Sequence, residues 1–199
     1  LTDNPDRLLM NRMDVPWLKE QAKINPHNFR ETLLAFGGLV RRRQSLWARD
    51  AALHLVRAMD QALLADGSFD FTRLGSWGKV PNTTDPSHYE PKRGEWFDGT
   101  ATSGRALEAL VWLFEETGEP SVLNLARRIA AHHLACSVNR DGRVRQEIVC
   151  AENVGHCHSY HGTLRGLLLF GLLTGQKEYA DAVEVTYRKA VRNRMVHES

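Results

Sequence analysis

The first segment whose residue types could take part in catalysis has carboxylates beside aromatic side chains. Glu95 and Asp98 flank the Trp96-Phe97 pair, and Trp77 stands between glycines earlier in the same long connection. An indole ring stacks on the apolar face of a sugar, and a carboxyl group in an apolar setting keeps its proton long enough to act as a general acid. Trp77 and Trp96 are therefore expected to bind a sugar ring beside the two acids. The plainer alternatives are that Asp98 caps the next helix and that Glu95 is a solvated loop residue.

A second segment, further along the chain, offers another acid and several imidazole rings. Glu152 precedes His156, His158, Tyr160 and His161. Glycoside hydrolysis uses a pair of carboxylates, one as acid and one as base or nucleophile, so Glu152 is expected to complete a pair with Glu95 or Asp98. The histidines and the tyrosine are expected to bind the sugar; the alternative is that one or two histidines only pack or cap the helix start.

Metal binding by this second segment is a weaker hypothesis. Cys150, Cys157 and the neighbouring histidines are ligand types, but their spacing is no standard zinc signature. A tight His-Cys-His run also cannot point all three side chains to one face of a helix or strand. We therefore predict no metal. The sequence contains no phosphate-binding loop or dinucleotide fingerprint, and we predict no cofactor.

Repeated helical hairpins are the elements expected to position these residues. A helix, a Thr-Gly turn and a second helix occupy residues 105–130 and recur at 163–183, with Thr117-Gly118 and Thr174-Gly175 lying 57 residues apart. Apolar residues follow the spacing of one helix face in both copies. A looser third copy has helices at 29–40 and 45–64. The fold class is therefore predicted as all-α, with 105–114 and 163–173 as neighbouring, near-parallel helices.

The connections between hairpins are much longer than the turns inside them. Residues 67–102 and 137–159 each lead into the first helix of a hairpin, and loops of this length are unusual unless they have a function. Parallel first helices would bring both connections to one rim, which places Glu95 or Asp98 across a cleft from Glu152. Two local exceptions are expected: a short helix at 7–23 and a small β-hairpin at 138–149.

The length and composition are those of a single globular domain that covers residues 1–199. The 199 residues are 42% hydrophobic and carry a net charge of +2, which does not suit a nucleic-acid partner. The longest apolar run, residues 167–173, is far shorter than the roughly 20 residues that span a bilayer, so no membrane partner is predicted. Three cysteines favour a reducing, cytoplasmic compartment, while a secreted location stays open because the chain begins without Met.

Several other residues are expected to have structural roles. Trp17, Trp47 and Trp112 sit at helical spacing among apolar residues and are expected in the core. One of His132 and His133 is expected to face the core and the other water. The run Arg41-Arg42-Arg43 is expected to be a solvated helix end.

The hairpins with their Thr-Gly turns resemble the six-hairpin glycosidase superfamily. The similarity is good over 95–191 and loose over 29–64, and residues 156–166 are loosely similar to helix starts in β-L-arabinofuranosidase-like and unsaturated glucuronyl hydrolase-like proteins. The resemblance implies an (α/α) toroid. Six hairpins close such a ring and only three are present, so it implies an incomplete ring whose open flank is covered by the remainder of a longer chain or by self-association. The resemblance to β-L-arabinofuranosidase-like proteins also suggests Cys150 or Cys157 as a nucleophile. Glu152 is favoured over either cysteine, because the cysteine-rich metal-site pattern of those proteins is absent from this sequence.

Two classes of function follow from these observations. The first is a carbohydrate-active enzyme, a glycoside hydrolase with a carbohydrate substrate and paired carboxylates; a sugar epimerase or a polysaccharide lyase on the same toroid is a variant of it. The second is a helical-repeat module that binds another protein without catalysis.

Overall fold

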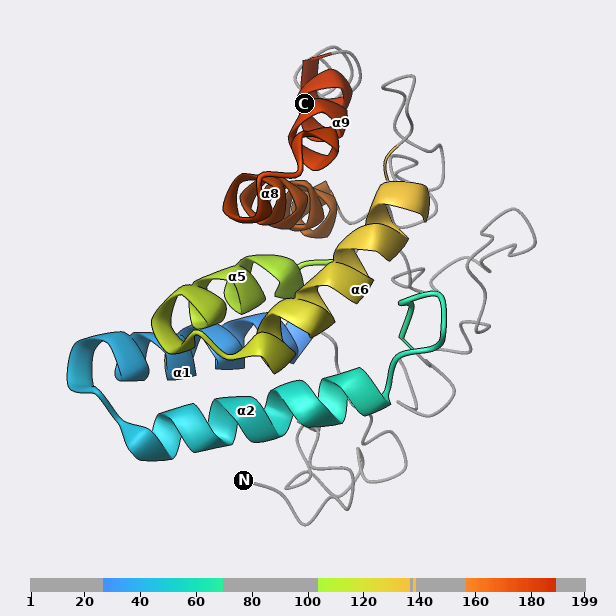
Figure 1. Cartoon of the computed structure of the whole chain (residues 1–199). Coiled ribbons are helices and arrows are strands. Elements are labelled where there is room, and N and C mark those ends of the chain that lie inside the picture. The colour runs from blue at the N-terminus through green and yellow to red at the C-terminus, as the bar shows by residue number, and fades with distance from the viewer. Residues whose placement is uncertain (1–26, 70–103, 137, 139–156, 189–199) are drawn as a thin grey trace, which may run out of the picture.

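The computed structural model describes residues 27–69, 104–136, 138 and 157–188, and every regular element in these ranges is an α-helix. The helices form three hairpins (Figure 1). In chain order they are α1 (His27–Arg43), α2 (Leu46–Gln61), α5 (Ala106–Thr117), α6 (Pro120–Cys136), α8 (Cys157–Thr174) and α9 (Lys177–Thr186). The all-α prediction is confirmed for this part of the chain, as are the three hairpins. None of the described helices is both long and apolar enough to cross a bilayer.

The two Thr-Gly turns have the same local structure, which explains why the dipeptide recurs. The hydroxyl groups of Thr117 and Thr174 each donate a hydrogen bond to the carbonyl oxygen four residues earlier, at 2.7 and 2.8 Å. Gly118 and Gly175 then adopt left-handed φ values of 65° and 69°, which cost a glycine little and end the helix. Pro120 begins α6, where its missing N–H is not needed.

The turn of the first hairpin is built differently. The Ser45 hydroxyl accepts a hydrogen bond from the backbone N–H of Ala48 at 3.2 Å and so caps α2. No glycine precedes it: Gln44 takes the positive φ of 50°. The hairpin therefore closes through a serine cap instead of a glycine turn.

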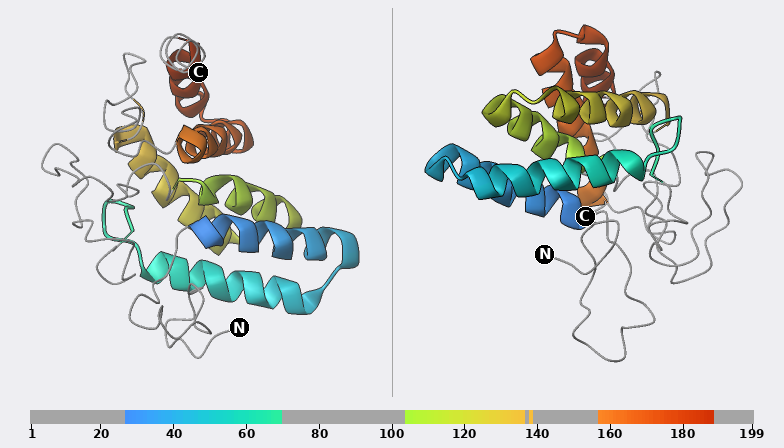
Figure 2. Two further views of the ribbon diagram at one scale, coloured as in Figure 1. Left: turned by 180° about the vertical axis from the view of Figure 1, so that it is seen from behind. Right: turned by 60° about the horizontal axis from the view of Figure 1, so that its bottom comes forward.

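The first helices pack in the order α1, α5, α8, and each returning helix packs against the first helix of its own hairpin. α5 lies between α1 and α8 and packs against both, while α2 and α6 pack against each other on the outer side (Figures 1 and 2). Burial follows this arrangement, because one stripe of each helix is apolar. The largest fully buried side chains include Phe29, Met59, Leu107, Leu125 and Phe170.

The arrangement of α5 and α8 confirms one part of the prediction and corrects another. The two helices are neighbours, but α8 is seen nearly end-on in Figure 1 where α5 lies across the view, so they cross and are not near-parallel. Glycines allow the crossing. A Cβ atom on Gly166 would lie 2.5 Å from the Cβ of Leu107, and one on Gly104 would lie 2.3 Å from the Cγ2 of Thr163. Without these Cβ atoms, the first halves of the two helices approach backbone to backbone.

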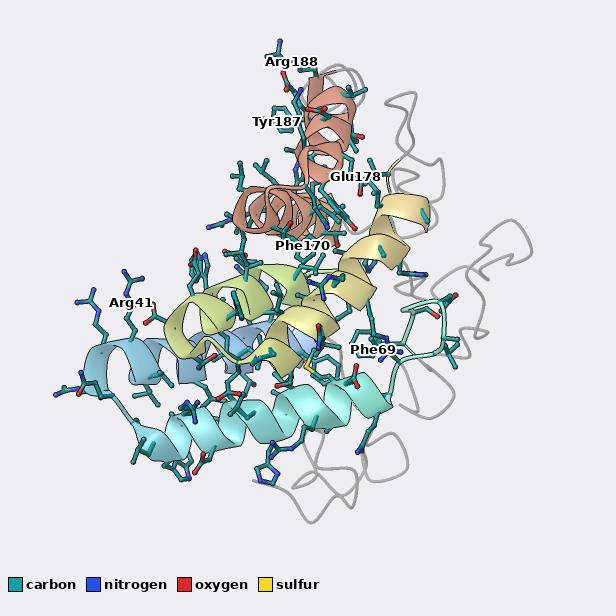
Figure 3. The ribbon with its side chains drawn as sticks, viewed as in Figure 1. Arg41, Phe69, Phe170, Glu178, Tyr187 and Arg188 are labelled. Atoms are coloured by element: carbon teal, nitrogen blue, oxygen red, sulfur yellow. The ribbon has the colours of Figure 1, made fainter. Side chains whose placement is uncertain are left out.

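The segment after α2 returns against α6. Leu63 and Phe69 form an isolated antiparallel bridge, and Gly67, with φ 86°, approaches the carbonyl of Arg128 so closely that a Cβ atom there would lie 2.3 Å from its oxygen. His132 and His133 are both buried on this part of α6, so the expectation that one of them faces water is wrong. Phe69, labelled in Figure 3, is buried, and its ring centroid lies 5.5 Å from that of Phe29.

Some predictions concern residues outside the described part of the chain. These are the short helix at 7–23, the β-hairpin at 138–149 apart from Val138, and the burial of Trp17.

Candidate functional site

A buried carboxylate joins the first helices of all three hairpins. Glu108 lies in the first turn of α5 and its side chain is 2% exposed. Its Oε2 accepts hydrogen bonds from Nε and Nη2 of Arg30 in α1, at 3.1 and 2.9 Å. Its Oε1 pairs with Nη2 of Arg165 in α8 at 2.9 Å. A carboxylate buried in an apolar helix run needs such partners, because an unpaired buried charge is strongly destabilising.

Two further charged residues extend this arrangement. Arg30 Nη1 donates to Oε1 of Glu31 at 2.6 Å, and Nη2 of Arg105 lies 3.5 Å from the same oxygen. Burial by itself lowers the pKa of Arg30, but the hydrogen bonds to Glu108 and Glu31 outweigh burial, so the pKa is raised and the guanidinium stays charged. We call Arg30, Glu31, Arg105, Glu108 and Arg165 the arginine–glutamate cluster. It holds three cations and two carboxylates.

The arginine–glutamate cluster joins the first parts of α1 and α5 to the middle of α8. Arg105 and Glu108 lie at the start of α5 and Arg30 and Glu31 near the start of α1, whereas Arg165 is the ninth of the 18 residues of α8. The start of α5 also touches the second turn of α8 directly: Gly104 meets Thr163, and a Cβ atom on Gly162 would lie 2.9 Å from the Cγ of Arg105. The two long connections rejoin the described chain at Gly104, just before α5, and at Cys157, the first residue of α8.

An exposed indole adjoins the arginine–glutamate cluster. Trp112 follows Glu108 by one turn of α5 and is 41% exposed, so its predicted burial is wrong. The guanidinium carbon of Arg165 lies 5.7 Å from the centroid of the Trp112 ring, within the range of a cation–π contact. The helical period places Trp112 on the side of α5 that Arg165 reaches, not on the side that α6 covers. Trp47 is exposed as well, at the first turn of α2, which corrects the prediction for that residue too.

One sequence-predicted site residue has a described side chain. His161 is half-buried in α8, and its ring lies 6.5 Å from that of Tyr187, which Figure 3 labels beyond the end of α9. Burial lowers the pKa of His161, which favours the neutral imidazole at pH 7. The neutral ring can accept a hydrogen bond from a sugar hydroxyl as well as donate one.

The other predicted site residues are not placed by the structure. His158 and Tyr160 belong to the first turn of α8, but their side chains lie outside the described part. The acids Glu95, Asp98 and Glu152, together with Trp77, Trp96 and His156, lie in the undescribed ranges. The cleft between the predicted acids therefore stays a prediction.

The arginine–glutamate cluster and Trp112 are absent from the sequence-based candidates. Charged residues at helix starts are common, and no motif connects positions 30, 108 and 165. One signal was present: Glu108 is the only charged residue in the otherwise apolar run 106–114. A carboxylate at such a position predicts a buried partner, although the sequence does not identify which arginine provides it.

Two other places were candidates for a site. A pocket of about 230 Å³ lies between α2 and α6, but Asp60 is its only acid, and Asp60 Oδ1 pairs with Nη1 of Arg128 at 2.5 Å. Among the described residues, no three His, Cys, Asp or Glu side chains are grouped to hold a metal ion. Neither place offers the paired acids that sugar hydrolysis needs.

Comparison with protein-family models, curated proteins and solved structures found no match. The functional argument therefore depends on the residues and on the geometry described above.

Proposed function

We propose that this chain belongs to a carbohydrate-active enzyme, a glycoside hydrolase built on an incomplete (α/α) toroid. One observation carries the proposal: the start of α5 is in direct contact with the second turn of α8, through Gly104 with Thr163 and Gly162 with Arg105. The segment with Glu95 and Asp98 leads into the first of these helices and the segment with Glu152 into the second.

The helix starts are a favourable place for this chemistry. The backbone N–H groups of a helix's first turn are unpaired and carry partial positive charge, which favours carboxylates and sugar oxygens. The first turn of α5 lies against the second turn of α8, and the arginine–glutamate cluster ties α1 to both helices. The segment with Glu95 and Asp98 thus enters α5 beside the second turn of α8, and the segment with Glu152 enters α8 at Cys157, five residues before Gly162.

The proposed mechanism assigns a role to each acid. Glu95 or Asp98 protonates the leaving oxygen, and Glu152 acts as base or nucleophile, while Trp77 and Trp96 stack on the sugar and the His156–His161 segment binds its hydroxyl groups. A separation of about 5 to 5.5 Å between the two carboxyl groups would produce retention of configuration, and about 6.5 to 9.5 Å would produce inversion.

The test is hydrolysis of a panel of 4-nitrophenyl glycosides and plant oligosaccharides by the wild-type chain and by Glu95→Gln, Asp98→Asn and Glu152→Gln. Loss of a true acid or nucleophile lowers turnover by about 100-fold or more and leaves the circular dichroism spectrum unchanged. Glu115→Gln is the matched control, because Glu115 is an exposed carboxylate in the second half of α5. Undiminished turnover in Glu152→Gln would remove Glu152 from the mechanism.

Exposed apolar side chains favour a second candidate, a protein-binding role. Leu172 on α8 and Leu46 at the start of α2 are 66% and 75% exposed. A further hairpin of a longer chain, or a second copy, would remove such side chains from water. Light scattering of wild type and Leu172→Ser tests the second copy: a dimer that Leu172→Ser dissociates supports self-association, and a concentration-independent monomer rejects it.

A further inference from the structure

Trp112 and Arg165 form a partly exposed pair beside the arginine–glutamate cluster. Trp112 comes from α5, Arg165 comes from α8, and the guanidinium lies over the indole ring. Both side chains keep a large exposed fraction, 41% and 56%. Their surface is therefore open to a ligand although the two groups already touch each other.

Glu108 holds this pair in place. An arginine side chain on a surface samples many rotamers, and ordering it on ligand binding costs conformational entropy. Here Nη2 of Arg165 is anchored by the buried Oε1 of Glu108 at 2.9 Å, and Glu108 is itself fixed by Arg30. Arg165 is thus held near one orientation before any ligand arrives.

The chemistry of the pair suits a sugar ring. A flat indole offers an apolar face to the C–H groups of a ring, and a planar guanidinium offers parallel N–H donors that match two adjacent oxygen atoms. His161 lies one turn before Arg165 on the same side of α8, where its half-buried ring adds a polar group.

We propose that Trp112 and Arg165 form a sugar-binding subsite of this enzyme. The inference builds on the proposed hydrolase and names the part of the oligosaccharide that the enzyme holds: a ring with adjacent free hydroxyl groups, stacked on Trp112 and hydrogen-bonded to Arg165. Glu108 is a positioning residue for this subsite and does not touch the sugar.

The test combines binding with turnover. Isothermal titration calorimetry measures the dissociation constants of cellohexaose, xylohexaose, mannohexaose and arabinohexaose for wild type, Trp112→Leu and Arg165→Lys. For the hexasaccharide that binds, each substitution raises Kd about tenfold, because stacking is lost in the first and the paired donors in the second. Arg165→Lys keeps the charge, so its effect isolates the geometry of the donors.

Matched controls separate this effect from general damage. Trp47→Leu removes another exposed indole with one aromatic neighbour, Phe36, and Arg57→Lys changes an exposed arginine on α2. Both controls keep the wild-type Kd, and all four variants keep the wild-type helix content.

The outcomes distinguish this inference from the proposed hydrolase. Turnover with an unchanged Kd in both Trp112→Leu and Arg165→Lys rejects the subsite and leaves the hydrolase standing. Binding that requires both residues, without turnover of any substrate, supports the subsite and rejects hydrolysis. If none of the four hexasaccharides binds the wild type, the subsite is rejected.

Discussion

Replacing Glu108 by glutamine tests whether the arginine–glutamate cluster holds α1, α5 and α8 together. The substitution keeps the volume of the side chain and one acceptor oxygen, but it removes the buried charge that Arg30 and Arg165 share. It also places an amide N–H₂ group against the guanidinium groups. Both are hydrogen-bond donors, so the amide nitrogen cannot accept a hydrogen bond from either arginine.

The expected cost differs between the two arginines. Arg30 is 20% exposed, so its charge-assisted hydrogen bonds to Glu108 are worth about 1.5–3 kcal/mol. Arg165 is 56% exposed, so water replaces most of its interaction and the pair is worth about 0–1 kcal/mol. Glu108→Gln should therefore lower the free energy of unfolding by about 3 kcal/mol, which corresponds to a fall in Tm of about 10 °C for a chain of this length.

Urea unfolding followed by circular dichroism measures these differences, with double-mutant cycles that combine Glu108→Gln with Arg30→Gln or Arg165→Gln. The coupling energy should be about 2 kcal/mol with Arg30 and below about 1 kcal/mol with Arg165. Glu115→Gln, the exposed carboxylate of the same helix, should change stability by less than about 0.5 kcal/mol. A larger coupling with Arg165 than with Arg30, or a loss below about 1 kcal/mol in Glu108→Gln, would refute the reasoning.

Three further predictions concern stability. Gly166→Ala should destabilise the fold by about 1–3 kcal/mol, because its Cβ would lie 2.5 Å from that of Leu107. Gly38 has open space around it, so Gly38→Ala should stabilise α1 by about 0.5–1 kcal/mol. Chemical unfolding of the two variants checks that the effects have opposite signs. Ser45→Ala should lower the free energy of unfolding by about 1 kcal/mol through loss of the α2 cap, and an unchanged urea midpoint would contradict this. Burial, with a smaller contribution from the adjacent imidazole, holds the pKa of His133 well below 6.5, so below that pH the unfolded chain binds a proton that the folded chain does not. Stability should therefore fall by up to about 1.4 kcal/mol per pH unit as pH drops below about 6.5, and His133→Leu should flatten this slope in urea unfolding at several pH values.

Local features of the hairpins were predictable from the sequence because they depend on neighbouring residues. The left-handed turn at Gly118 and the start of α6 at Pro120 follow from the backbone preferences of those residues, and the cap at Ser45 follows from the acceptor hydroxyl of its side chain. The repeated Thr-Gly dipeptide then located the second and third hairpins correctly. The locations of the predicted acids relative to one another stay a prediction.

Contacts between hairpins were not predictable in the same way. Helical periodicity shows which residues share a face, but it does not show which element covers that face. Trp112 was expected in the core for this reason, yet it lies at an edge of α5 beside Arg165. Similarly, the glycines at 104, 162 and 166 are visible in the sequence, but only their contacts reveal that α8 crosses α5 there.

The sequence by itself determined that the described chain is helical, where each hairpin turns, and that the chain carries acids and aromatic residues of the kinds that sugar chemistry uses. These properties depend on backbone conformation and residue type, which act over a few positions. Only the tertiary structure decided that Glu108 pairs with Arg30 and Arg165, and that Trp112 remains exposed beside them. The pairs join residues 78 and 57 positions apart, and their formation depends on how closely three helices pack.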